Sequence, residues 1–258
     1  MLQVRRDKYM VLNGELVTWQ PATQPYVFQD LHTLGYRARY VAQHIDFLNI
    51  ASNKLFTKKL QQSVHTIEQQ ITQLLEKNHT ARNVTTGVRL SLNAEGNYRI
   101  ESLETSIYSG YVLRSLHPSV LYITSDMPWP AFPTSALLQG RELADTIAQQ
   151  RGAHEALLIN SEGYILSDAV RPLIMIREYK ATFSPTTQHS VESATAVAAC
   201  RHIGLKVTFE HFGIDEIEQA DELMYVNYQG ITSITKVGRH TFMHILSERI
   251  AEAMEELY

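Results

Sequence analysis

The spacing of apolar residues changes several times along the sequence, which predicts a chain of mixed helices and strands. Between residues 40 and 75, apolar side chains recur every three or four positions, first around Ile45 and Leu48 and then around Ile67 and Ile71. This spacing puts them on one face of a helix, so two helices are predicted here. The same pattern predicts further helices over residues 135–151, 191–203, 214–221 and 242–257.

Short apolar runs bounded by turn residues predict strands, many of them joined as hairpins. Asn13-Gly14 separates two such runs, and Asn-Gly is a favoured two-residue hairpin turn. Helices and hairpins are mixed along the chain, so the expected fold class is α+β. The remaining strands are predicted within residues 27–39, 84–100, 119–124, 155–160, 164–167, 172–177, 180–183, 205–210, 223–227 and 231–235.

A proline-rich segment, Met127-Pro-Trp-Pro-Ala-Phe-Pro133, interrupts these patterns. Proline lacks a backbone N–H and restricts the residue before it, so the segment is predicted to be irregular and extended. We expect it to separate two domains. They would comprise an N-terminal α+β domain over residues 1–125, an interdomain linker over 126–134 and a C-terminal α+β domain over 135–258.

The amino-acid composition excludes several classes of protein. The 258 residues are 44% hydrophobic, enough for one large core or two smaller ones, and the net charge of −4 comes without a basic cluster that would indicate nucleic-acid binding. No apolar run reaches the roughly 18 residues of a membrane span, and no apolar segment of a secretion signal follows the first charged residues. A single cysteine, Cys200, excludes an intramolecular disulfide. We therefore expect a cytoplasmic protein that binds neither nucleic acid nor membrane.

One pair of histidines has a spacing that is found in metal sites. His240 and His244 lie four residues apart in a predicted helix. No third ligand lies nearby and the HExxH pattern is absent, so no metal is expected.

The stretch from Gly140 to Asp168 carries the most distinctive pattern in the chain, with a helix that ends at Gly152, a strand and a Ser161-Glu-Gly163 turn. It resembles the centre of the class IV aminotransferase family, the fold-type IV pyridoxal-phosphate enzymes. These include branched-chain and D-amino-acid aminotransferases and aminodeoxychorismate lyase. Weaker likenesses follow the family's order at residues 13–17, 44–52, 183–185, 214–223 and 230–234.

The resemblance implies a two-domain α+β fold like that of aminodeoxychorismate lyase or D-amino-acid aminotransferase. Its second domain would be barrel-like, and a cofactor cleft would lie between the domains. It also implies a homodimer in which loops of the partner help to close the cleft. A small-molecule ligand is expected in this cleft.

The residues that the family's chemistry requires are replaced at three positions. A family lysine holds the cofactor as a Schiff base, but no lysine occurs between Lys77 and Lys180, and the lysine position falls on Thr134. The family's phosphate-binding arginine falls on Phe47. Its glutamate, which meets the pyridine nitrogen, falls on Ser167, with Asp168 beside it on the opposite face of a strand.

Two further segments of the family bind the phosphate group. One is the start of a helix, where backbone amides cradle the phosphate, and it falls on Val191 and Glu192. Glu192 would place a negative charge close to that phosphate. In the other, a later loop, only Asn227 fits the family pattern.

These replacements lead to a hypothesis of a non-catalytic or pyridoxal-phosphate-independent protein that binds a small molecule. No cofactor is expected, and any pyridoxal phosphate would be bound non-covalently. In the simplest interpretation Thr134 is structural, His44 makes a hydrogen bond inside a helix interface, and Phe47 fills core volume. Residues that could line a ligand cleft are His44, Arg89, Trp129, Thr134, Asp168 and Arg171, while Arg114 is a further possible carboxylate anchor.

Two alternatives remain open from the sequence. One is an active aminotransferase or 4-amino-4-deoxychorismate lyase that uses a displaced lysine, for which Lys180 and Lys236 are the candidates. The other is a cofactor-free enzyme that uses the old cleft for acid–base chemistry through His44, Ser167 or Asp168.

Overall fold

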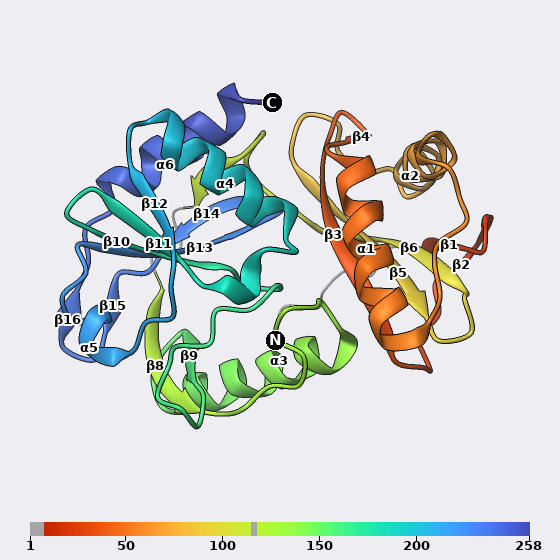
Figure 1. The fold of residues 1–258 in the computed structure, drawn as a ribbon. Coiled ribbons are helices and arrows are strands. Elements are labelled where there is room, and N and C mark those ends of the chain that lie inside the picture. Colours follow the sequence, from red (N-terminus) through yellow and green to blue (C-terminus); the bar gives the residue numbers. More distant parts are fainter. Residues whose placement is uncertain (1–7, 115–117) are drawn as a thin grey trace. The chain divides into compact units, whose positions relative to one another are not determined.

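The computed structural model describes residues 8–114 and 118–258, and its contacts divide the chain into two compact units (Figure 1). Unit 1 is Met1–Gly110 and unit 2 is Tyr111–Tyr258. Each unit combines helices with a six-stranded sheet, and unit 2 has a second sheet of four strands. The fold class is therefore α+β, as predicted.

The division between the units differs from the predicted linker at residues 126–134, which lies inside unit 2. Strand β8 (Ser119–Thr124) precedes this segment and pairs in parallel with β9 (Glu155–Ile159), which follows it. The proline-rich segment is therefore part of a crossover between two strands of one sheet.

Unit 1 is a six-stranded sheet packed with two helices, α1 (Val41–Phe56) and α2 (Val64–Lys77). The helices contact each other and the sheet, and their buried apolar residues include Ile45, Leu48, Ile67 and Ile71 from the predicted periodicity. Asn13 and Gly14 form the predicted hairpin turn, both with positive φ. In order β2-β1-β6-β5-β3-β4, the sheet contains β1 (Tyr9–Leu12), β2 (Glu15–Thr18), β3 (Tyr26–Leu34), β4 (Arg37–Ala38), β5 (Thr86–Asn93) and β6 (Tyr98–Thr105).

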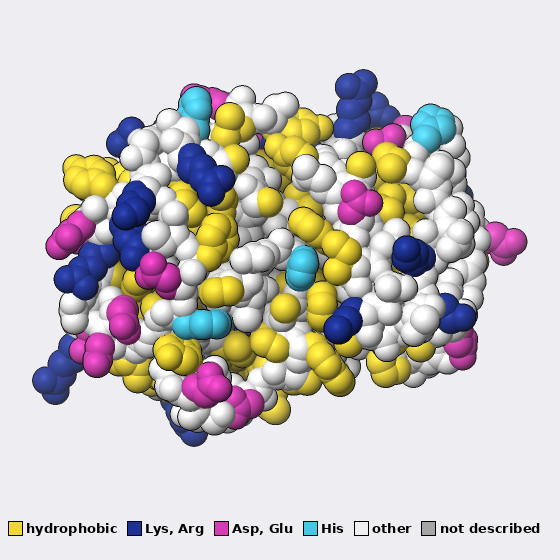
Figure 2. All heavy atoms as spheres, in the orientation of Figure 1, with side chains coloured by type: hydrophobic (Ala, Val, Ile, Leu, Met, Phe, Trp, Pro, Cys, Tyr) yellow, Lys and Arg dark blue, Asp and Glu magenta, His cyan; other side chains and the backbone are white. Residues whose placement is uncertain are grey.

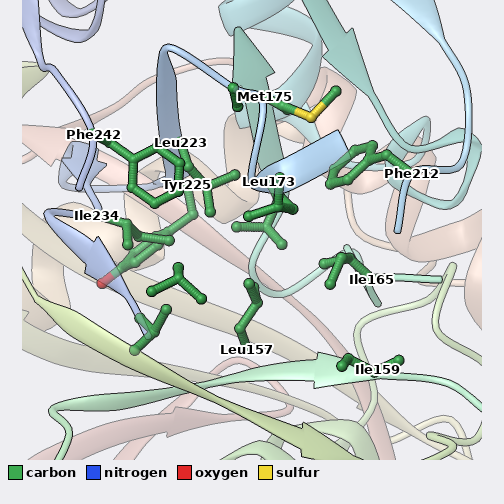
Figure 3. Close-up of a cluster of buried hydrophobic side chains, with 14 residues drawn as sticks. Leu157, Ile159, Ile165, Leu173, Met175, Phe212, Leu223, Tyr225, Ile234 and Phe242 are labelled. Carbon is green, nitrogen blue, oxygen red and sulfur yellow. The ribbon is translucent and has the colours of Figure 1, made fainter. Parts of the chain in front are cut away.

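Unit 2 contains two sheets, with a buried apolar core that draws side chains from both of them (Figure 3). Leu157 from β9 and Leu173, the first residue of β10 (Leu173–Arg177), both belong to this core. The larger sheet has the order β12-β11-β10-β13-β14-β7, and its strands are β7 (Val112–Arg114), β10 (Leu173–Arg177), β11 (Lys180–Phe183), β12 (Lys206–Phe209), β13 (Glu222–Asn227) and β14 (Gly230–Ser233). The smaller sheet, in order β16-β15-β8-β9, adds β15 (Lys236–Val237) and β16 (His240–Thr241).

The helices of unit 2 flank these sheets. Helix α3 packs on β8 and β9, whereas α4 and α6 pack on each other and on the larger sheet. The helical elements are α3 (Ser135–Gln150), the 3-10 turn η1 (Pro185–Thr187), α4 (Val191–His202), α5 (Ile214–Ile217) and α6 (Ile245–Glu256).

Strand β7 joins the larger sheet through a contact that only glycine permits. Gly230 has a φ of +119°, and a Cβ atom there would lie 2.2 Å from the carbonyl oxygen of Val112. Any side chain at this position would therefore separate β7 from β14.

Two local predictions were wrong. Residues 164–167 were predicted as a return strand, but they make only isolated bridges, from Ile165 to Ile159 and from Tyr164 to Gly213. The chain turns away there because Asp168 binds the next backbone amides, as described below. His240 and His244 do not share a helix either, since His240 lies in β16 and His244 precedes α6.

Within residues 8–114 and 118–258, no group of three or more histidine, cysteine, aspartate or glutamate side chains is arranged to hold a metal ion. In the same residues, every helix is too short or too polar to cross a membrane. On the face drawn in Figure 2, lysine and arginine side chains lie among acidic ones.

Candidate functional site

Thr134 forms the N-cap of α3. Its hydroxyl accepts a hydrogen bond from the amide of Leu137 at 3.1 Å, and its extended backbone is the usual conformation of a capping residue. The side chain is buried. The hydroxyl is thus used to begin the helix, which agrees with the structural interpretation of this threonine.

Ser167 begins a tightly bonded loop that leads into β10. Its hydroxyl accepts a hydrogen bond from the amide of Leu173 at 2.7 Å, and its carbonyl oxygen accepts one from the hydroxyl of Thr186. Ser167 is 1% exposed. Its side chain therefore fixes the start of β10 and leaves the loop conformation little freedom.

Asp168 forms a buried ion pair with Arg141 of α3. One carboxylate oxygen lies 2.5 Å from Nε of Arg141, and the other accepts the amides of Val170 and Arg171, each at 2.9 Å. Asp168 is 0% exposed and Arg141 is 4% exposed. Burial lowers the pKa of Arg141, although the neighbouring carboxylate opposes this effect. The pair ties the loop after Ser167 to α3.

Arg171 belongs to a second ion-pair group beside the first. It donates two hydrogen bonds to Asp145 of α3, at 3.1 and 2.7 Å, and lies 3.5 Å from Glu155. Burial alone would lower the pKa of Arg171, but the hydrogen bonds to Asp145 and the charges of Glu155 and Asp145 raise it overall. Arg171 also lies over the ring of Tyr225, whose hydroxyl donates to Glu155 at 2.9 Å. This predicted carboxylate anchor is therefore held by carboxylates of the chain itself.

The N-terminus of α4 carries a buried carboxylate. Ser190 caps the helix by accepting the amide of Ser193 at 3.2 Å, and its hydroxyl donates to a carboxylate oxygen of Glu192 at 3.3 Å. Glu192 is 7% exposed, and Val191 beside it is fully buried. The first turn of this helix therefore already contains a negative charge.

Hydrogen bonds connect the start of α4 to the Ser167 loop. The hydroxyl of Ser193 donates to that of Thr187 at 3.2 Å, and Thr187 donates to the carbonyl of Ser184 at 2.8 Å. The hydroxyls of Ser184 and Thr186 lie 2.8 Å apart, and Thr186 donates to Ser167. The position predicted for the pyridine nitrogen, Ser167, thus belongs to the same region of unit 2 as the helix start predicted for the phosphate, whereas Phe47, the other predicted phosphate position, lies in unit 1.

The proline-rich segment also reaches this region. The ring of Phe132 stacks on His189, with centroids 5.6 Å apart and planes 12° apart, directly before α4. The amide of Ala169 donates to the carbonyl of Pro130 at 2.9 Å. Trp129 has a positive φ of 50° and a largely exposed side chain, so it lies at the surface. Thr134 follows this segment directly and therefore lies in the same part of the unit.

Asn227 ends β13 and supports the turn to β14, because its side-chain oxygen accepts the amide of Gln229 at 2.9 Å. The preceding amide, that of Val226, donates to Pro172 at 3.1 Å. Arg114, at the end of β7, donates a long hydrogen bond from Nη1 to the hydroxyl of Thr232 at 3.5 Å. Sequence reasoning missed Arg141, Asp145 and Glu155, although Arg141 and Asp145 lie four residues apart on α3 and so share a face.

In unit 1, the two predicted cleft residues lie on opposite faces of the sheet. The side chain of His44 on α1 lies 3.2 Å from the oxygen of Gln29, whereas Arg89 on β5 binds Asp30 through two hydrogen bonds of 2.7 Å. Gln29 and Asp30 are neighbours on β3, so they point to opposite faces. Arg89 also lies over the ring of Phe28. The structure therefore does not bring His44 and Arg89 together.

Burial determines the protonation of His44 on α1. It lowers the pKa of His44 to about 3, because the protonated ring would lose its hydration. Phe47, one turn further along α1, is only half-buried, whereas Leu48 is completely buried. Leu48 therefore fills the core more fully than Phe47 does.

We expect the Asp168→Asn substitution to destabilise the protein by about 3–5 kcal/mol, since it leaves a buried guanidinium without its counter-charge. The free energy of unfolding in urea measures this effect. The matched control is Glu76→Gln, which breaks the exposed pair with Arg82 and should cost less than about 1 kcal/mol. Equal losses in the two variants would contradict the assignment of the Arg141–Asp168 pair as a central constraint.

His44 should make stability depend on pH. Its folded-state pKa lies below the ordinary 6.5, so the unfolded chain binds a proton that the folded chain does not. The stabilisation is complete above the unfolded pKa and is lost as pH falls toward 3. From about pH 6 to about pH 4, the wild type should lose about 2 kcal/mol more than His44→Gln. Parallel unfolding curves for the two proteins across this range would refute the prediction.

Comparison with known proteins shows to which family this chain belongs. The sequence profile described as amino-transferase class IV matches residues 27–237. A search of curated proteins found no match. Among solved structures, a branched-chain aminotransferase from Thermoproteus uzoniensis with norvaline has a TM-score of 0.77 at 14% identity, over 96% of this chain and 94% of that one.

Two further structures show the same fold. The branched-chain aminotransferase of Escherichia coli has a TM-score of 0.79 at 15% identity, covering 98% of this chain and 95% of that chain. An aminotransferase from Brucella abortus, bound to its cofactor pyridoxal phosphate, has a TM-score of 0.79 at 14% identity, covering 96% and 98%. The profile match spans most of the sequence, and the fold agrees with it. The chain belongs to the class IV aminotransferase family and has the fold of the fold-type IV pyridoxal-phosphate enzymes.

Proposed function

We propose that this chain is a class IV aminotransferase-like protein that has lost pyridoxal-phosphate catalysis and binds a small molecule without that cofactor. One observation carries the proposal: at two positions where the family has catalytic residues, this chain has hydroxyl groups that are bonded to backbone amides. Thr134 caps α3 and Ser167 binds the amide of Leu173, so both groups hold backbone in place. Neither can supply the amine or the carboxylate that the family's chemistry requires.

The residues present do not fit pyridoxal phosphate held in the family manner. A threonine cannot form a Schiff base, and a phenyl ring at Phe47 cannot pair with a phosphate as an arginine does. The hydroxyl of Ser167 accepts a hydrogen bond from the amide of Leu173, and it carries no negative charge that could pair with a pyridinium nitrogen. We therefore expect no resident cofactor, and any pyridoxal phosphate that binds would do so non-covalently.

The positions of the two displaced-lysine candidates do not favour an active pyridoxal-phosphate enzyme. Lys180 on β11 forms an ion pair with Glu210 at 3.0 Å, with its side chain 38% exposed. Lys236 on β15 is exposed. A Schiff-base lysine requires a sheltered amine that can lose its proton, and an exposed ammonium group or one held by a carboxylate is poorly suited to this.

Acid–base catalysis without a cofactor is also disfavoured. The carboxylate of Asp168 is engaged by Arg141 and by two amides, so its oxygens are committed to the fold. His44, with a pKa of about 3, is uncharged at neutral pH and is a weak base. Neither group is therefore suited to act as the acid or base of a cofactor-free reaction, which supports a binding protein.

We further propose a cytoplasmic homodimer. The family resemblance supports the dimer, and the single cysteine, Cys200, which is buried, supports a reducing compartment. Light scattering after size-exclusion chromatography should give twice the chain mass of 29.4 kDa. A single-chain mass that persists as concentration rises would contradict the dimer.

The loss of catalysis can be tested by trapping. We expect that incubation of the wild type with pyridoxal phosphate and borohydride, followed by mass spectrometry, gives no stoichiometric lysine adduct. The variant Thr134→Lys, treated identically, tests whether an amine at that position restores trapping. A stoichiometric adduct on Lys180 or Lys236 of the wild type, together with transamination or lyase activity, would overturn the proposal.

A further inference from the structure

We propose that Asn13 is a site of spontaneous deamidation, and that a clamp formed by Asn97 and the amide of Tyr98 slows this modification while unit 1 is folded. The proposal goes beyond the proposed function, because it concerns the first hairpin of the chain and involves no ligand. It starts from the dipeptide Asn13-Gly14, in which the residue after the asparagine has no side chain to shield its amide nitrogen.

The chemistry requires only water. The amide nitrogen of Gly14 bonds to Cγ of Asn13 while the bond from Cγ to Nδ2 breaks. The amide proton of Gly14 leaves with Nδ2 as ammonia, and a five-membered imide forms. Water then adds to one of the two imide carbonyls and opens the ring, which gives aspartate or isoaspartate at position 13. Both residues of the dipeptide are exposed, so water reaches the ring.

The hairpin depends on this dipeptide. Leu12 pairs with Glu15, so the turn has only two residues, and both have positive φ, 50° and 95°. Turns of this kind favour asparagine followed by glycine, since other residues rarely adopt positive φ. A Cβ atom at Gly14 would also lie 3.3 Å from the hydroxyl oxygen of Tyr98. Protection from deamidation therefore has to come from contacts of the Asn13 side chain.

Both ends of the Asn13 carboxamide are bonded to the neighbouring hairpin. Its Nδ2 donates to Oδ1 of Asn97 at 2.9 Å, and its Oδ1 accepts the amide of Tyr98 at 2.9 Å. Tyr98 begins β6, which lies on the side of β1 opposite to β2, whereas Gly14 leads into β2. The two hydrogen bonds thus direct Cγ of Asn13 toward β6 and oppose its approach to the nitrogen of Gly14.

Asn97 is held in the orientation that the clamp requires. Its Nδ2 donates to Glu95 at 3.1 Å, which leaves its Oδ1 to accept from Asn13. The backbone amides of Asn97 and Glu95 both donate to the side-chain oxygen of Asn93, at 2.9 and 3.1 Å. The loop that carries the clamp is therefore fixed by its own hydrogen bonds.

Deamidation would change the hairpin irreversibly. Isoaspartate adds one atom to the backbone of a two-residue turn, so the pairing of Leu12 with Glu15 would no longer fit. Strand β2 lies at the edge of the sheet and is held there through β1. We therefore expect the modified hairpin to lose the register between β1 and β2.

The test follows the conversion of Asn13 in full-length protein at neutral pH, using peptide mass mapping with chromatography that separates isoaspartate from aspartate. Asn97→Ala removes one contact of the clamp and should convert Asn13 roughly three- to tenfold faster than the wild type, which is the factor expected for the loss of one hydrogen bond. The control Asn53→Ala removes an exposed carboxamide on α1 and should react at the wild-type rate.

A second comparison requires no variant. Urea removes the clamp, so unfolded wild type and unfolded Asn97→Ala should convert Asn13 at equal rates, at least about tenfold faster than the folded wild type. Equal rates in folded and unfolded wild type would overturn the proposal, as would an Asn97→Ala rate no higher than that of Asn53→Ala. If circular dichroism shows that Asn97→Ala does not fold, the wild-type comparison decides alone.

Discussion

The ion pair between Arg141 and Asp168 is the constraint on which the candidate site depends. It joins α3, whose N-cap is Thr134, to the loop that leads into β10. Taking two charges out of water is costly, and the pair persists because each group is almost completely surrounded by partners. Once Asp168 is turned toward Arg141, the neighbouring Ser167 and Arg171 are directed to the backbone of β10 and to Asp145 respectively.

The sequence predicts well those elements whose cause is local. The apolar spacing around Ile45 and Ile67 predicts α1 and α2, and Asn13-Gly14 predicts the first hairpin, because periodicity and turn chemistry act over a few residues. The predicted return strand at residues 164–167 failed for a non-local reason. Its geometry is decided by an arginine on α3, more than twenty residues earlier in the chain, and no local pattern shows that pairing.

Some residues of the candidate site can be found from the sequence, and others can be found only from the structure. Thr134, Ser167 and Glu192 are found from a family resemblance, since that resemblance aligns positions irrespective of their contacts. Arg141, Asp145 and Glu155 are found only when the chain is folded, because a charged side chain reads as a solvated surface residue until its partner is known. The structure also shows a common pattern, in which Arg89 and Arg171 are bound by the chain's own Asp30 and Asp145. Both arginines are thus held by ion pairs within their own unit.

The glycine at position 230 has a consequence for how the chain can be divided. Because Gly230 lets β7 lie against β14, the chain becomes part of unit 2 directly after Gly110. A fragment that started at the proline-rich segment would lack both β7 and β8, and it would expose the backbone edges of β14, β15 and β9. The boundary suited to separate expression of the second unit is therefore at residues 110 and 111, where no sheet is cut.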